Sequence, residues 1–243
     1  MYLSPLMINR KYFTILSAFL GIFIIAGFVA CKSKDKAANL NDDPQSIFLD
    51  YQVTGNAEED SVTILLHFRD GDIEGRAFRL DKPSGVTLDG EVLAFDSSKM
   101  TGYYYEIRKP LAAFTGKHNI VFTDIQGNTY REDFSFQPFS LINPPAELKF
   151  SDSLGLQFEG LGKEDYLLVL MTDTSFPGKG INRVDTIRDG NLVISPDELK
   201  QLAPGPVQIM FTREFERPLD NGTESGGRLA ITYRISREFI LQE

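Results

Sequence analysis

Ser61-Val62-Thr63-Ile64-Leu65-Leu66-His67-Phe68-Arg69 is the segment that indicates the fold class of this chain most clearly. Large apolar side chains recur at every second position, with Val62, Ile64, Leu66 and Phe68 on one side and Thr63, Leu65, His67 and Arg69 on the other. A period of two places successive side chains on opposite faces of a strand, whereas a helix requires a period near 3.6. The stretch therefore predicts a half-buried β-strand.

Similar segments separated by turn signals follow this strand. Thr87–Leu93 predicts a hairpin, because Asp89-Gly90 at its centre is a dipeptide that favours tight hairpin turns. Tyr103–Ile107 predicts another strand, and Lys117–Thr123 predicts a second hairpin with Thr129–Gln137. The first part of the chain is therefore expected to be all-β.

A cluster of prolines divides these segments from a second set. Pro138, Pro144 and Pro145 would interrupt any strand ladder between Gln137 and Ala146. Apolar strand patterns resume beyond them, at Leu154–Phe158, Tyr166–Met171, Val207–Phe211 and Leu229–Ile235. We therefore expect two β domains, residues 47–140 and 141–243, each long enough to enclose its own core.

One short helix is predicted within the second set. Ser195-Pro196-Asp197-Glu198 places an N-cap serine before a proline, with a glutamate three residues after the cap. Pro204-Gly205 then limits the helix to one or two turns.

The N-terminal region carries a different signal. Arg10 and Lys11 precede an uncharged apolar run from Ile15 to Ala30, and Cys31, the only cysteine, follows it directly. A basic start, a short apolar run and a small residue at its end are typical of a secretory signal peptide. The alternative is an uncleaved transmembrane helix, which needs about 20 apolar residues, more than this run supplies.

Phe28-Val29-Ala30-Cys31 resembles the lipobox of bacterial lipoproteins, although Phe28 stands where that family prefers leucine. The resemblance implies cleavage before the cysteine by signal peptidase II, and diacylglycerol and fatty acyl chains on Cys31. It also implies an outer-membrane location, because Lys32, and not aspartate, follows the cysteine. We thus expect a signal peptide at 1–30 and a lipidated, flexible tether at 31–46, with the membrane contacted through the lipid.

Two further segments resemble immunoglobulin-like and fibronectin type III domains. Gly116–Asp124, closed by Gly127-Asn128, is similar to the last hairpin of bacterial immunoglobulin-like domains, and Leu202–Val207 resembles a fibronectin-like crossing between sheets. The core tryptophan of such domains is absent, since the chain has no Trp. The resemblance implies two tandem immunoglobulin-like β-sandwiches and no catalytic residues.

The charge of the chain limits its partners. The formal net charge is −9, and removing residues 1–30, which carry two cations and no acid, lowers it to −11. Such an acidic chain lacks the basic surface that nucleic acid binding requires. Lys32, Lys34 and Lys36 are the local exception, and they lie in the tether.

An acidic loop is the candidate metal site. Asp70, Asp72 and Glu74 precede Gly75 at alternate positions, and Asp81 stands at the twelfth position, as in a calcium-binding loop. The alternative is a plain Asp-Gly turn between the strand ending at Arg69 and another near Ala77–Leu80. Ca²⁺ is therefore the only cofactor that the sequence suggests.

No motif in the sequence indicates a reaction. The two histidines, His67 and His118, lack the spacing of a zinc site or a catalytic triad. We expect an anchored envelope module that recognises a protein or glycan, with no catalytic residues. The alternatives are a hydrolase using a pair of surface carboxylates about 5 to 9 Å apart and a calcium-stabilised adhesion module.

Overall fold

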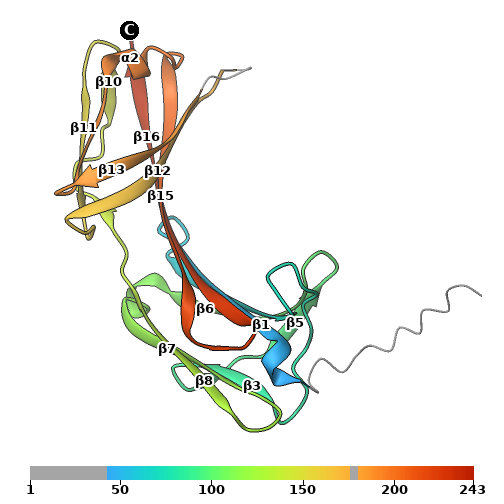
Figure 1. Cartoon of the computed structure of the whole chain (residues 1–243). Helices are drawn as coiled ribbons and strands as arrows, with labels where there is room; N and C mark the ends of the chain where they lie inside the picture. Colours follow the sequence, from blue (N-terminus) through green and yellow to red (C-terminus); the bar gives the residue numbers. More distant parts are fainter. Residues whose placement is uncertain (1–42, 176–179) are drawn as a thin grey trace, which may run out of the picture. The chain divides into compact units, whose positions relative to one another are not determined.

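A computed structural model describes residues 43–175 and 180–243, and it is built almost entirely of β-strands (Figure 1). Cys31 and the predicted signal peptide lie outside the described residues. Within the described ranges, no helix has the length and apolar character needed to cross a membrane.

The first half of the described chain contains two 3₁₀ turns, η3 (Pro44–Ser46) and η4 (Leu111–Ala113). Its strands are β1 (Ile47–Asn56), β2 (Ser61–Asp70), β3 (Gly85–Leu88), β4 (Glu91–Val92), β5 (Phe95–Ser98), β6 (Gly102–Pro110), β7 (Gly116–Thr123) and β8 (Thr129–Phe136). The second half contains β9 (Ser140–Leu141), β10 (Glu147–Lys149), β11 (Leu154–Glu159), β12 (Glu164–Asp173), β13 (Gly180–Arg188), β14 (Asn191–Ile194), α2 (Pro196–Leu199), β15 (Gly205–Thr223) and β16 (Gly226–Gln242).

These strands form one long sheet and one short sheet. The long sheet has the order β5-β6-β2-β1-β16-β15-β12-β13-β14-β11-β9, with β10 paired to β16, and the short sheet has the order β4-β3-β7-β8. The short sheet packs against the long one through aromatic side chains. The rings of Phe68 on β2 and Phe122 on β7 lie 4.8 Å apart, and those of Phe136 and Tyr233 lie 5.9 Å apart.

In the C-terminal half, two parts of the long sheet, one containing β11 and the other containing β12 and β15, face each other and enclose the core. Phe158 on β11 meets Phe211 on β15 edge-on, with ring centroids 4.9 Å apart. Leu167, Val169 and Met171 on β12 are fully buried in the same core. The predicted all-β class with sandwiched sheets is confirmed.

The hairpin of β15 and β16 contributes buried side chains to both halves of one continuous hydrophobic core. Figure 1 shows the two strands side by side, and their register runs from Gly205↔Leu241 to Thr223↔Gly226. The first part of β15 pairs with β12 up to Thr212, whereas β16 pairs in parallel with β1 from Gly227 to Arg234. The strands of the expected second domain therefore belong to the same sheet as β1, and the boundary between 140 and 141 stays a prediction.

The local predictions are confirmed where side-chain pattern or turn chemistry is strong. The apolar positions of Ser61–Arg69 lie on β2, and Val62, Ile64, Leu66 and Phe68 are completely buried. Asp89 and Gly90 both adopt positive φ in the turn between β3 and β4. At α2, the Glu198 carboxylate accepts a hydrogen bond from the Ser195 backbone N–H at 2.9 Å, as the capping box requires.

Candidate functional site

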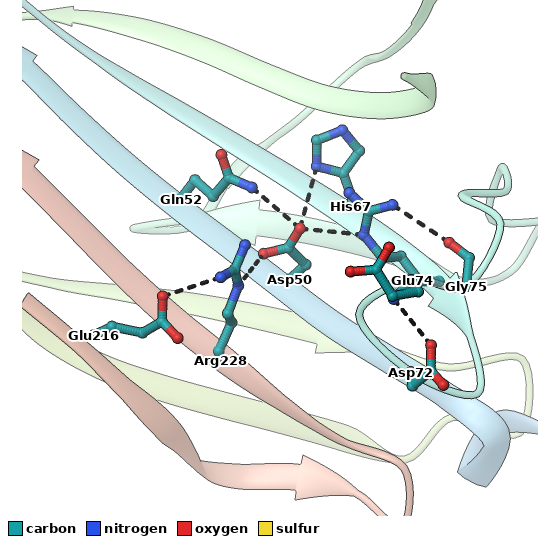
Figure 2. A network of polar contacts seen from close by, with 9 residues as sticks. Asp50, Gln52, His67, Asp72, Glu74, Gly75, Glu216 and Arg228 are labelled. Atoms are coloured by element: carbon teal, nitrogen blue, oxygen red, sulfur yellow. Dashed lines mark hydrogen bonds and ion pairs between the residues drawn. The ribbon is translucent and has the colours of Figure 1, made fainter. Parts of the chain in front are cut away.

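The acidic loop does not assemble a metal site. Asp72 accepts a hydrogen bond from the Glu74 backbone N–H at 2.9 Å, so its carboxylate stabilises the turn itself (Figure 2). Across residues 43–175 and 180–243, no three or more His, Cys, Asp or Glu side chains gather closely enough to hold a metal ion. Asp70, Asp72, Glu74 and Asp81 are thus not brought together, and calcium binding stays a prediction without support from this geometry.

The strand expected near Ala77–Leu80 is also largely missing. Ala77 makes a single bridge to Arg69, and the residues up to Leu80 form no further ladder. The tight turn requires glycine at position 75, because a Cβ there would lie 1.9 Å from the Asp70 carbonyl oxygen.

A buried carboxylate that sequence reasoning missed lies on the outer side of the long sheet. Asp50 on β1 has no exposed surface, and Figure 2 shows its contacts. Its Oδ1 accepts from Arg228 Nε at 2.8 Å, and its Oδ2 accepts from Arg69 Nε at 3.2 Å and from Gln52 Nε2 at 3.1 Å. The carboxylate therefore links three adjacent strands, β1, β2 and β16.

His67 lies beside this carboxylate without bonding to it. The imidazole is 3% exposed, and its Nδ1 is 3.8 Å from Asp50 Oδ2, beyond hydrogen-bond distance. Neither ring nitrogen has a hydrogen-bond partner within the described chain. Burial, together with the Arg69 charge, lowers the pKa of His67 against the opposing effect of Asp50. The ring and its neighbours form a network of buried contacts that joins β1, β2 and β16.

A groove of about 750 Å³ lies between β8 and the β15–β16 hairpin. Phe134, Phe215 and Ile231 supply part of its apolar lining, and Phe215 is half exposed. Its charged lining consists of Lys117, Arg131, Arg217 and one carboxylate, Asp133. A concave, largely apolar site with a few polar groups is the usual form of a binding site.

Side chains, and not a strand ladder, connect β8 to β15 along this groove. Arg217 Nη2 donates to the Asp133 carbonyl at 3.1 Å, and Asn221 Nδ2 donates to the Arg131 carbonyl at 3.0 Å. Arg217 also pairs with the buried carboxylate of Glu132 at 2.6 Å. The hairpin is thereby fixed beside β8 while the two backbones remain unpaired.

The register identifies which backbone groups of β8 face the groove. On β7, the Asn119 carbonyl accepts from the Asp89 N–H, so odd-numbered residues of β7 bond toward β3 and even-numbered residues bond toward β8. His118 is paired with Phe134, so Asp133 and Ser135 direct their backbone groups away from β7. β8 is therefore an edge strand at the groove.

A second hollow of about 310 Å³ adjoins the groove and shares Ser135, Phe215 and Ile231 with it. Two carboxylates, Asp165 and Glu214, line this hollow. Asp165 is already engaged, because its Oδ2 is 3.5 Å from Arg213 Nη1 and its Oδ1 accepts from the Tyr166 N–H at 2.9 Å. These contacts give Asp165 the role of a structural ion-pair partner.

The groove could not be found from the sequence. Its lining comes from β7, β8, β15 and β16, and Lys117 is more than 110 positions from Ile231. The alternation along each strand was visible, but the position of β15 beside β8 depends on tertiary structure. The sequence contains one indication of the Asp50 network, namely an acidic residue between Leu49 and Tyr51 in an otherwise apolar segment.

Comparisons with known proteins establish no family. No family model matches the chain, and no curated protein matches it. Among solved structures, the fibronectin(III)-like modules of Clostridium thermocellum CbhA are 11% identical, with 81% of this chain and 94% of that chain covered and a TM-score of 0.23. DIP-gamma IG1+IG2 is also 11% identical, covering 80% of this chain and 94% of that one, with a TM-score of 0.22.

A third solved structure is SGBP-B of a Bacteroides ovatus mixed-linkage glucan utilization locus, in complex with a heptasaccharide. It is 15% identical with a TM-score of 0.24, and the match covers 79% of this chain but only 46% of that chain. Similarities this low carry no argument about function.

Proposed function

We propose that this protein is a lipid-anchored module of the bacterial cell envelope that binds a protein or glycan partner at the groove beside β8. The anchor is Cys31, which follows the apolar run directly and is the only cysteine of the chain. An unpaired thiol in an oxidising envelope is prone to oxidation, and thioether formation with diacylglycerol removes that liability. Several acyl chains make attachment to the outer membrane stable, whereas a single chain binds only marginally.

The observation that carries the binding role is the composition of the groove. It combines exposed aromatic and aliphatic surface with cations, and Asp133 is the only carboxylate in its lining. Hydrolysis by the carboxylate-pair mechanism requires two acids on either side of the scissile bond. This groove supplies one acid, so its chemistry favours recognition over hydrolysis.

Replacement of Cys31 by serine tests the anchor. The wild-type protein from native membranes should begin at a diacylglyceryl cysteine, and C31S should accumulate as an uncleaved precursor that starts at Met1. Mass spectrometry of both N-termini provides the readout. A wild-type protein that retains Met1, or that carries a free thiol at Cys31, would refute the anchor.

A photo-crosslinking amino acid tests the groove. Incorporated at Phe215 in the intact envelope, it should give a discrete adduct on irradiation. The matched control is the same amino acid at Val193, an apolar side chain of β14 that is 60% exposed but lies outside the groove. Equal adducts at both positions, or an adduct at Val193 only, would exclude the groove as the binding site.

A further inference from the structure

Three hollows follow one another along β8 and the segment that continues it. The groove and the second hollow share Ser135, and a third hollow of about 620 Å³ shares Gln137 and Tyr233 with the second. Arg131 lines the groove and Gln137 lines the two later hollows, and an extended chain places these two residues about 20 Å apart. The three hollows therefore form a row, the track, whose length suits an elongated ligand.

The backbone of β8 is largely occupied along the track. The odd-numbered residues direct their carbonyl groups outward, and three of the four carbonyls from Arg131 to Gln137 already accept hydrogen bonds from Asn221, Arg217 and Arg213 of β15. Addition of a peptide strand requires a row of free N–H and C=O groups, and here it would have to displace these side chains. Recognition therefore depends on the side chains that line the track.

Several of these side chains carry unused hydrogen-bonding groups. Within residues 43–175 and 180–243, no hydrogen-bond or ion-pair partner contacts the polar side-chain groups of Asp60, Gln137, Glu159, Glu214 and Tyr233. Carboxylates only accept hydrogen bonds, whereas amide and phenol groups both donate and accept. The hydroxyl groups of a ligand also donate and accept, so a polyhydroxylated ligand satisfies both kinds of group.

Tyr233 is held firmly where the second and third hollows meet. Its side chain is only 3% exposed, and its ring packs edge-on against Phe136 and Phe139, with ring centroids 5.9 and 5.2 Å away. Buried tyrosine hydroxyls usually have a hydrogen-bond partner, and this hydroxyl has none in the described part of the chain. A hydroxyl fixed in this position points to a ligand that completes its hydrogen bonding.

The lining favours a ligand without net charge. Among the described side chains, three cations and one carboxylate line the groove, one cation and two carboxylates line the second hollow, and two carboxylates line the third. These charges nearly balance, and Arg131 and Arg217 are already paired with acids. Phe215, half exposed where the first two hollows meet, adds an apolar surface for the C–H face of a sugar ring.

We infer that the track binds a linear, uncharged oligosaccharide that extends from the groove to Tyr233. This inference rests on the proposed binding function and names the class of its ligand. The ring of Phe215 packs against a sugar ring, while the Gln137 amide and the Tyr233 hydroxyl form hydrogen bonds with sugar hydroxyl groups.

Oligosaccharides of defined length test the inference with the lipid-free chain, residues 32–243. The probes are cellohexaose, laminarihexaose, mannohexaose and xylohexaose, titrated by isothermal calorimetry. At least one should bind, and the disaccharide of the same linkage should bind at least about tenfold more weakly, which corresponds to the loss of about one good hydrogen bond. Because the ligand is uncharged, its affinity should be the same at about 0.05 M and about 0.5 M NaCl.

Two substitutions test the contacts. Tyr233→Phe removes only the hydroxyl and Phe215→Ala removes the exposed ring, and each should weaken binding of the hexasaccharide about three- to tenfold. The matched controls are Tyr103→Phe for the hydroxyl and Val193→Ala for the exposed apolar side chain. Both control residues lie outside the three hollows, so these variants should bind as the wild type does.

The oligosaccharide results remain decisive when a variant fails to fold, because they need no mutation. No binding of any of these hexasaccharides, equal binding of the disaccharide, or tighter binding of hexagalacturonate or of a chitosan hexamer would overturn the inference. A photo-adduct between position 215 and residues 32–42 of the same chain would also overturn it, because the tether would then occupy the track. A photo-adduct with another protein, without binding of any hexasaccharide, would overturn the inference and leave the proposed binding function intact.

Discussion

At the scale of single residues, Asp50 is the side chain whose replacement should destabilise the fold most. Asp50→Asn preserves the size of the group but removes the negative charge between Arg69 and Arg228, whose side chains are only 20% and 30% exposed. Losing one partner of a buried ion pair leaves uncompensated charge, so we expect a loss of about 3 kcal/mol in the free energy of unfolding. Urea unfolding of residues 32–243 measures this.

Asp133→Asn is the matched control for that experiment. Asp133 also pairs with an arginine, Arg131, but both side chains are more than half exposed. Exposed ion pairs contribute little, so the urea midpoint should remain close to that of the wild type. Similar losses in the free energy of unfolding of both variants would show that the buried Asp50 network stabilises the fold no more than an exposed ion pair does.

His67 should give the protein a dependence on pH. Its folded pKa is below the ordinary value of 6.5, so the unfolded chain binds more protons once the pH falls below that value. Protonation linked to His67 therefore lowers the free energy of unfolding as the pH decreases through 6.5 toward the lowered pKa. His67→Phe, which has a ring without ionisable nitrogens, should remove that contribution.

The measurement compares the free energies of unfolding of H67F and the wild type at about pH 8 and about pH 5.5, on either side of the ordinary histidine pKa. The free energy of unfolding of H67F minus that of the wild type should be more positive at the lower pH than at the higher pH. Parallel decreases in both proteins would contradict a neutral, buried His67.

The residue scale also marks the limit of sequence reasoning. The buried face of β2 follows from Val62, Ile64, Leu66 and Phe68, because a period of two has one structural meaning. Asp50 could not be placed in the same way, since its two arginines come from different strands and Arg228 is 178 positions away. The calcium prediction had a related weakness, because spacing alone did not specify where the carboxylates point.

At the scale of elements, close packing between β1 and β16 depends on a glycine. A Cβ at Gly227 would lie 2.5 Å from the Leu49 carbonyl oxygen and 2.7 Å from Leu219 Cδ1. Gly227→Ala should therefore displace β16 from β1 and reduce the free energy of unfolding by about 1 to 3 kcal/mol. Urea unfolding again provides the measurement.

Gly155 on β11 is the control for the glycine effect. A Cβ there would meet no atom within 4 Å. Gly155→Ala should change the free energy of unfolding by no more than about 0.5 kcal/mol, as expected for a surface substitution. If the two alanine variants unfold at the same urea concentration, close contact at Gly227 is not what holds these strands together.

At the scale of the whole molecule, we expect that residues 43–140 do not fold as an independent domain. Residues 43–140 lack β16, which pairs with β1 and contributes the buried Leu229 and Tyr233 to the same core. A fragment of residues 43–140 should consequently show no cooperative unfolding transition in urea, whereas residues 32–243 should show one. Circular dichroism across the titration distinguishes the two.

Joining residues 205–234 to that fragment through a Gly-Ser linker should restore part of the transition. A sharp transition in residues 43–140 alone would instead support an independent domain ending at residue 140. The prolines that predicted this boundary do not exclude all pairing between Gln137 and Ala146, because the short strand β9 pairs there with β11. Local sequence also carries no information about a hairpin that returns from a distant segment.

The parallel pairing of β1 with β16 also has a consequence for synthesis. Asp50 and Arg228, which hold these strands together, are 178 residues apart. At about 5 to 20 residues per second, a ribosome adds the second of them roughly 9 to 36 seconds after the first. We expect the first sandwich to stay open during that interval, which would keep the nascent polypeptide extended enough to pass through a translocation channel.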